Sequence, residues 1–148
     1  MPAAVVILAV LWTASLAWAE ADSIIGIWNE SNNDAQFEIY KCASLYCGKI
    51  HSLREPNEPP PDRSTPGHPK TDSKNPDPGL RNRPLVGMPF MSGFEYQGQN
   101  TWKGKIYNLE DGKTYNCRLS LAGANLLQVR GYVGIPLLGE TVTWTRAN

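Results

Sequence analysis

Short segments of alternating apolar and polar residues follow one another through most of the chain. They cover residues 24–31, 36–42, 47–53, 84–91, 93–97, 101–109, 113–121, 126–133 and 137–146. Turn sequences at 32–34, 110–112 and 123–125 are typical of tight connections between antiparallel strands. No stretch has long helical periodicity. The pattern predicts an all-β antiparallel meander, closed into an up-and-down β-barrel of eight to ten strands because closure removes exposed edges. A two-sheet sandwich is the alternative.

One long segment interrupts the meander. Residues 54–79 contain no apolar residue and eight of the twelve prolines of the chain. A loop of this length inside a compact domain is usually functional or disordered. Asp77 followed by Pro78 is typical of a helix N-cap with proline at the first helical position, and Pro84 would end such a helix. We expect a long Pro-rich polar loop, 54–83, with a short helical turn.

The N-terminal segment has the composition of a secretory signal peptide. Residues 1–19 hold 16 apolar residues and no charge, and they end in Ala17-Trp18-Ala19. An A-x-A sequence after an apolar core is typical of a cleavage site. No Lys or Arg precedes the core, so an uncleaved anchor is the alternative. We expect a signal peptide at 1–19, a single domain at 20–148, no later membrane span, and an exported protein that is periplasmic or secreted.

The net charge of the chain indicates which classes of partner it can bind. The chain has 14 Lys plus Arg and 14 Asp plus Glu, with a formal net charge of zero. A general nucleic-acid binder needs a basic face, so neutrality argues against a nucleic-acid partner.

The three cysteines have two interpretations. Cys42 and Cys47 flank four residues, and in a hairpin they would face each other closely enough for a disulfide, which export permits. The alternative is a metal site with His51, which lacks a fourth ligand. Cys117 alternates with Leu119 on one strand face and is interpreted as a buried apolar residue. The sequence also allows a disulfide between Cys117 and one of the other two cysteines.

Two sequences at opposite ends of the domain fit together. Gly26-Ile27-Trp28 opens the first strand, and Arg146 closes the last. This resembles the lipocalin and calycin arrangement, in which a G-x-W tryptophan on the first strand is covered by a basic residue. The resemblance implies that Trp28 closes one barrel end and that Arg146 lies on its ring as a cation–π pair.

A broader resemblance covers nearly the whole mature chain. The sequences CGKI, PKTD, NPDPGLRNRPLVG, WKGKIY, GKTY, VRGYVG and LGETVTWTR stand in order at 47–50, 69–72, 75–87, 102–107, 112–115, 129–134 and 138–146. Together they resemble the bacterial exported family called domain of unknown function 2147. The resemblance implies a lipocalin-like barrel in an exported protein and names no activity.

No catalytic constellation was found. Neither His51 nor His68 stands in a zinc-binding motif, and a G-x-S-x-G nucleophile sequence is absent. We therefore predict no catalytic residue, no metal and no cofactor. The sequence favours a non-catalytic protein, although it leaves the question of catalysis open.

The candidate ligand-binding residues form two groups. The first is a polar block in the loop, which could rim a site for an anionic or carbonyl-bearing ligand through its guanidinium groups. Alternatively, its members satisfy one another and tie the loop over the barrel mouth. The second group is aromatic and would either line a cavity or fill the core. The candidates are Asp72, Asn75, Arg81, Arg83, Trp102, Tyr107, Tyr115 and Tyr132.

The leading hypothesis is an exported binding protein for a small apolar or amphipathic molecule, with the polar loop at the mouth of the barrel. One alternative is an interaction or structural module with a filled barrel, whose Pro-rich loop docks an envelope protein partner. Another is an unrecognised envelope enzyme that uses Arg81, Arg83 and an acid such as Asp72.

Overall fold

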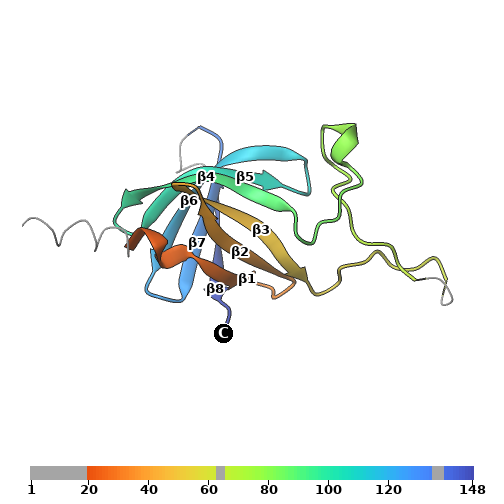
Figure 1. Cartoon of the computed structure of the whole chain (residues 1–148), viewed down its shortest axis with the longest axis horizontal. Helices are drawn as coiled ribbons and strands as arrows, with labels where there is room; N and C mark the ends of the chain where they lie inside the picture. The colour runs from red at the N-terminus through yellow and green to blue at the C-terminus, as the bar shows by residue number, and fades with distance from the viewer. Residues whose placement is uncertain (1–19, 63–65, 135–138) are drawn as a thin grey trace, which may run out of the picture.

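Eight antiparallel strands form a closed barrel (Figure 1). Each strand pairs with the next in sequence, and β8 pairs with β1 through Trp28 opposite Arg146. The strands are β1 (Gly26–Asn29), β2 (Ala35–Cys42), β3 (Leu45–Leu53), β4 (Pro89–Gly98), β5 (Thr101–Asn108), β6 (Lys113–Ala122), β7 (Leu126–Tyr132) and β8 (Glu140–Arg146). The prediction of an all-β up-and-down barrel is confirmed, and the sandwich alternative is wrong.

This computed structural model describes residues 20–62, 66–134 and 139–148. The predicted signal peptide at 1–19 lies outside these residues. Within them, no helix combines the length and apolar character needed to cross a bilayer.

The fourth strand differs from the prediction. Residues 84–91 and 93–97 were expected to form two strands, but β4 is a single strand from Pro89 to Gly98. Gly93 has φ +65° and lies where the register of β4 with β5 shifts between Ser92 and Glu95. The glycine therefore marks a bulge, which lets the strand bend without ending it.

The strand directions give the barrel two different ends. At one end lie the start of β1, the end of β8 and the turns around residues 43–44, 99–100 and 123–125. We call this the closed end. At the other, which we call the open end, lie the turns at 30–34 and 109–112, the end of β7, the start of β8 and the two ends of the long β3–β4 loop, whose described residues are 54–62 and 66–88.

Large side chains fill the closed end. Trp28 and Trp102 are fully buried there, packed with Phe94 and Leu127. A short 3-10 helix, η1 (Asp22–Ile24), crosses this end just before β1. The indole Nε1 of Trp28 donates to the Ile24 carbonyl at 2.9 Å, and that of Trp102 donates to the Ala21 carbonyl at 3.1 Å. Both buried indole donors therefore have a hydrogen-bond acceptor in the N-terminal segment that crosses the closed end.

Arg146 holds Trp28 and the segment before β1 in place at the closed end. Its guanidinium carbon lies 4.3 Å from the centre of the Trp28 ring. Its nitrogens donate to the carbonyls of Ser23, Ile25 and Ala124 at 2.7, 3.0 and 2.9 Å. A Cβ added at Gly26 would lie 2.9 Å from Arg146 Nη1, and the φ of Gly26 is +141°. The glycine of the G-x-W sequence is thus required both by its backbone conformation and by the arginine above it.

The first two cysteines form a disulfide with a Cα–Cα distance of 5.8 Å. The register differs from the expected face-to-face pair, since Cys42 lies opposite Leu45 and Cys47 lies opposite Tyr40. The turn is therefore shorter than the four residues between the cysteines, and the bridge runs diagonally across the hairpin. Both sulfurs are bonded to each other, so they are not available as thiolate metal ligands. Cys117 is free and buried, and burial raises its pKa to about 12.

Candidate functional site

A cavity of about 800 Å³ occupies the half of the barrel next to the open end. This volume lies within the range of sites that enclose drug-sized ligands. Its inner wall is apolar and comes from strands on all sides of the barrel, through Phe37, Ile50, Phe90, Ile106, Val129 and Trp144. The closed end is packed solid, so the barrel is half filled and half hollow.

Three aromatic rings form one side of the cavity. The ring centres of Phe37 and Trp144 are 4.5 Å apart, those of Phe37 and Phe90 are 5.0 Å apart, and those of Phe90 and Trp144 are 6.4 Å apart. Tilted contacts at these distances are favourable and hold the rings in place. The wall that a ligand would contact is therefore already organised.

A glycine accounts for part of the empty space. Leu127 and Val129 of β7 are buried, and by strand alternation Gly131 is the next inward position. A Cβ added at Gly131 would meet no atom within 4 Å. The inward side chains of β7 therefore become smaller toward the open end, from leucine through valine to glycine.

The mouth of the cavity is open to solvent. Val133 and Val142 line the cavity and are 70% and 47% exposed. The polar residues that border it are Glu30, Tyr107, Asn108, Glu110, Tyr115, Tyr132 and Glu140. An apolar wall with a polar mouth suits a ligand with one apolar and one polar part.

The Tyr115 hydroxyl is tied to the turn between β5 and β6. It donates to Asp111, and the hydrogen bond is the main cause that lowers the pKa of Asp111 and raises that of Tyr115. This bond fixes the phenol ring at the side of the mouth.

The polar block of the β3–β4 loop is centred on Asp72, which is only 1% exposed. Asn75 donates to its Oδ2 at 2.7 Å, Arg83 donates to the same oxygen from Nε and Nη2 at 3.2 and 3.0 Å, and Tyr107 donates to Oδ1 at 2.7 Å. Burial acts to raise the pKa of Asp72, but these hydrogen bonds and the charge of Arg83 outweigh it and hold the pKa below its ordinary value. Burial and the bond to Asp72 raise the pKa of Tyr107 to about 12.

The rest of the block organises the loop itself. Asn75 accepts from the backbone N–H of Asp77 at 2.9 Å, and Arg81 donates to the Asn75 carbonyl at 2.7 Å. Asp77 caps the short helix η2 (Pro78–Leu80) by accepting from the Gly79 N–H at 2.9 Å. These contacts match the interpretation in which the polar residues satisfy one another.

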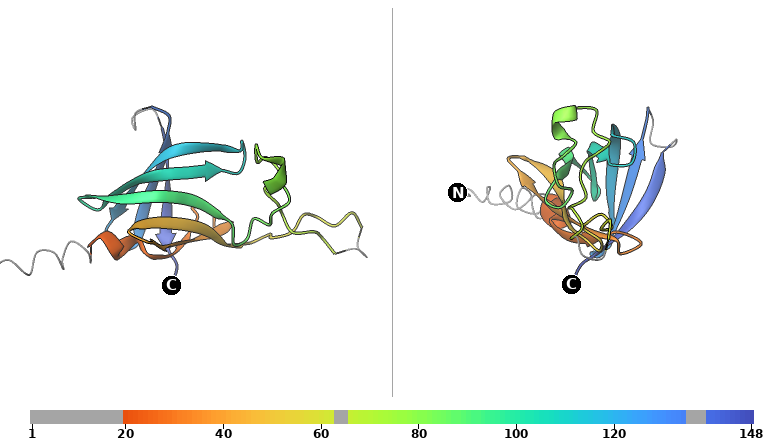
Figure 2. Two further views of the ribbon diagram at one scale, coloured as in Figure 1. Left: turned by 45° about the horizontal axis from the view of Figure 1, so that its top comes forward. Right: turned by 90° about the vertical axis from the view of Figure 1, so that its right-hand side faces the viewer.

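The loop is fastened beside the mouth and then leads away from the barrel. At the β5–β6 turn, a Cβ on Gly112 would lie 2.1 Å from the Lys74 carbonyl, so only glycine allows this close approach. Farther out, residues 54–62 and 66–70 form an extended arm (Figure 2), held by hydrogen bonds from Glu58 N–H to His68 and from Lys70 N–H to Pro56. None of residues 54–88 that the structure describes lines the cavity.

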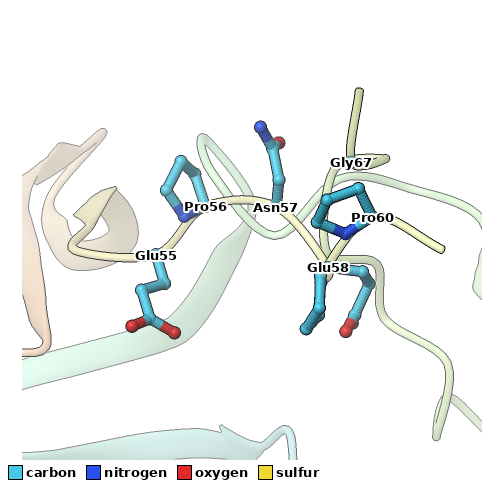
Figure 3. A pocket seen from close by; sticks show the side chains of 7 residues that line it. Glu55, Pro56, Asn57, Glu58, Pro60 and Gly67 are labelled. Carbon is cyan, nitrogen blue, oxygen red and sulfur yellow. The ribbon is translucent and has the colours of Figure 1, made fainter. Parts of the chain in front are cut away.

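A second hollow, of about 370 Å³, lies along the arm (Figure 3). Its lining residues at 55–60 are all exposed, and the side chains of Glu55 and Asn57 point to opposite sides of the chain. Such a surface does not converge on a ligand, so the barrel cavity is the candidate site.

The structure separates the predicted ligand-binding residues. Tyr107, Tyr115 and Tyr132 border the cavity. Trp102 belongs to the packed closed end, and the loop residues do not reach the cavity wall: Asp72, Asn75, Arg81 and Arg83.

The sequence reasoning missed several residues that line the cavity. They include Phe37, Phe90, Gly131 and the three glutamates at 30, 110 and 140. Alternation along the strands indicates that two of them face inward. Glu30 follows the inward Trp28 by two positions, and Glu140 precedes Val142 by two.

Comparison with known proteins supports the architecture. A family model described as an uncharacterized protein conserved in bacteria, DUF2147, matches residues 26–146. A solved structure, entitled as protein HP1028 from the human pathogen Helicobacter pylori and as belonging to the lipocalin family, superposes with a TM-score of 0.69. It is 28% identical, and the match covers 84% of this chain and 83% of that one. The search of curated proteins gave no match. The barrel is therefore lipocalin-like, as predicted.

Proposed function

Because the chain belongs to the DUF2147 family of uncharacterized bacterial proteins and folds as a lipocalin-like barrel, we propose that it binds a small apolar or amphipathic molecule in the barrel cavity without transforming it. The observation that carries this proposal is the half-hollow barrel, with an apolar wall around about 800 Å³ and an open mouth. Each CH₂ group that leaves water for such a wall contributes about 0.8 kcal/mol, so a short alkyl chain is enough for measurable affinity.

We further propose that the protein acts after export, in the periplasm or outside the cell. The Cys42–Cys47 disulfide supports this, because disulfides form and persist in oxidising compartments and are rare in the cytosol. The family description places such proteins in bacteria.

Binding of the neutral fluorescent probe N-phenyl-1-naphthylamine tests the proposal. In the wild-type protein we expect saturable enhancement of probe fluorescence. In Gly131→Leu the new side chain occupies the cavity, so the affinity should fall by at least about tenfold. Gln128→Leu adds the same side chain to the exposed outer face of β7 and should leave probe binding unchanged.

Circular dichroism and thermal unfolding establish that both variants keep the barrel. The proposal is wrong if the folded wild-type protein does not bind the probe, or if folded Gly131→Leu binds it as tightly as the wild type does.

A further inference from the structure

We infer that the cavity selects an amphipathic cation, an apolar body that carries an amine or quaternary ammonium group, over an anion of the same length. This inference rests on the proposed function and specifies the ligand class of the same cavity. Its basis is the sign of the charges that border the mouth.

All the charged residues that line the cavity are acidic. Glu30, Glu110 and Glu140 border it, and no Lys or Arg belongs to its lining within the described part of the chain. The ion pairs among the described residues involve none of these three glutamates. None of the three therefore forms a direct ion pair with another described side chain.

The three carboxylates come from separate elements around the mouth. Glu140 opposes Gly131 across the β7–β8 ladder and so belongs to the inward face of β8. Glu30 follows the last residue of β1, and Glu110 stands in the turn between β5 and β6. Charges of one sign around a low-dielectric opening focus the potential and attract a ligand head of the opposite sign.

Three basic residues of the barrel wall lie on its outer face. Lys103, Arg118 and Arg130 are in register across β5, β6 and β7. They alternate with the buried Trp102, Leu119 and Val129, so their side chains belong to the outer face. Within the described residues, the charged side chains that line the cavity are acidic, whereas these three basic residues lie on the outer wall.

The aromatic residues add to the same preference. Tyr115 borders the cavity on the same strand face as the buried Cys117, and the rings of Phe37, Phe90 and Trp144 form the cavity wall. An ammonium group near aromatic faces is stabilised by cation–π attraction, which a carboxylate does not gain. Exposed ion pairs are individually weak, so we expect the three carboxylates and the rings to give a selectivity of about tenfold to a hundredfold.

Three ligands with the same ten-carbon chain test the inference: decyltrimethylammonium, decanol and decanoate. Their affinities are measured on the folded wild-type protein, below micelle-forming concentrations, by displacement of N-phenyl-1-naphthylamine. We expect decyltrimethylammonium to bind tightest and decanoate weakest, with a difference that shrinks as salt is added.

Paired variants separate the local charges from the net charge. Glu30→Gln with Glu140→Gln should reduce the preference for the cation over the anion by about fivefold or more, a change larger than any change in decanol affinity. Glu55→Gln with Glu58→Gln removes the same charge from the exposed arm and should leave the preference intact.

The outcomes distinguish the two proposals. If decanol binds in the cavity but decanoate binds as tightly as decyltrimethylammonium, the charge inference is wrong and the binding function stands. If the arm variant loses the preference as fully as the cavity variant, net charge explains it and the inference is wrong. If none of the three ligands binds, the proposed function itself fails.

Discussion

Asp72 is a charged side chain at a position where water has almost no access. Its charge is held there by donors from its own loop, Asn75 and Arg83, and by Tyr107 of the barrel. A buried carboxylate is costly unless it is hydrogen-bonded, so these contacts join the loop to β5. The sequence placed the polar block in one segment, but it could not indicate Tyr107 as the partner because that residue lies 35 positions away.

At this scale we predict that Tyr107→Phe lowers the free energy of unfolding by about 1.5–3 kcal/mol at pH 7, the range for a hydrogen bond to a charged group. Because the pKa of folded Asp72 lies below its ordinary value of 3.8, the charged form stabilises the folded state above that pH. The difference between wild type and variant should therefore shrink as the pH falls through 3.8 toward the folded pKa. Urea unfolding at a series of pH values measures it.

Tyr115→Phe is the matched control, since its hydroxyl bonds the exposed Asp111. It should change the free energy of unfolding much less than Tyr107→Phe does, because its hydrogen bond lies in solvent. Equal effects of the two substitutions would contradict a special role for the buried contact.

At the scale of elements, alternation and turn sequences were sufficient to predict the strands of the meander and the capped turn after Asp77. They were not sufficient where a glycine bends a strand, because Gly93 has the same appearance in sequence whether it marks a bulge or a break. The hairpin register was also missed, since a turn of two residues or of four fits the same spacing of Cys42 and Cys47.

The β2–β3 hairpin gives a second prediction. Replacing both Cys42 and Cys47 by Ala should lower the free energy of unfolding by about 2 kcal/mol, the value expected for a disulfide that closes a short loop. Guanidinium unfolding with and without a thiol reductant measures the effect. The reductant should destabilise the wild-type protein and leave the double variant unchanged, and an equal response of both would argue against the bridge.

At the scale of the whole molecule, the two barrel ends differ: large buried side chains fill the closed end, and the cavity lies next to the open end. The resemblance of the terminal sequences to the lipocalin arrangement predicts that Gly26, Trp28 and Arg146 lie together, and the structure brings them into contact. The hollow half could not be located in the same way. Which residues face inward near the mouth depends on how all eight strands pair, and a polar residue such as Glu140 normally indicates the outer surface.

The closed end gives a third prediction. Arg146→Ala removes the cation over Trp28 and leaves the carbonyls of Ser23 and Ile25 without this donor, so it should cost about 2–4 kcal/mol in the free energy of unfolding. Urea unfolding measures the loss. Arg118→Ala, on the outer wall opposite Arg130, should be close to neutral because like charges face each other there. A similar loss in both variants would contradict the role of Arg146 in closing the barrel.

The position of the last residues has a practical consequence. Asn148 follows Arg146 by two residues, and the C-terminus lies next to the end of β8 (Figure 1), which belongs to the closed end. A surface anchor or reporter joined to Asn148 would therefore orient every molecule with its opening toward the solution. Immobilised in this way, the protein could be washed with one solute after another, and the same layer could be reused to screen for its ligand.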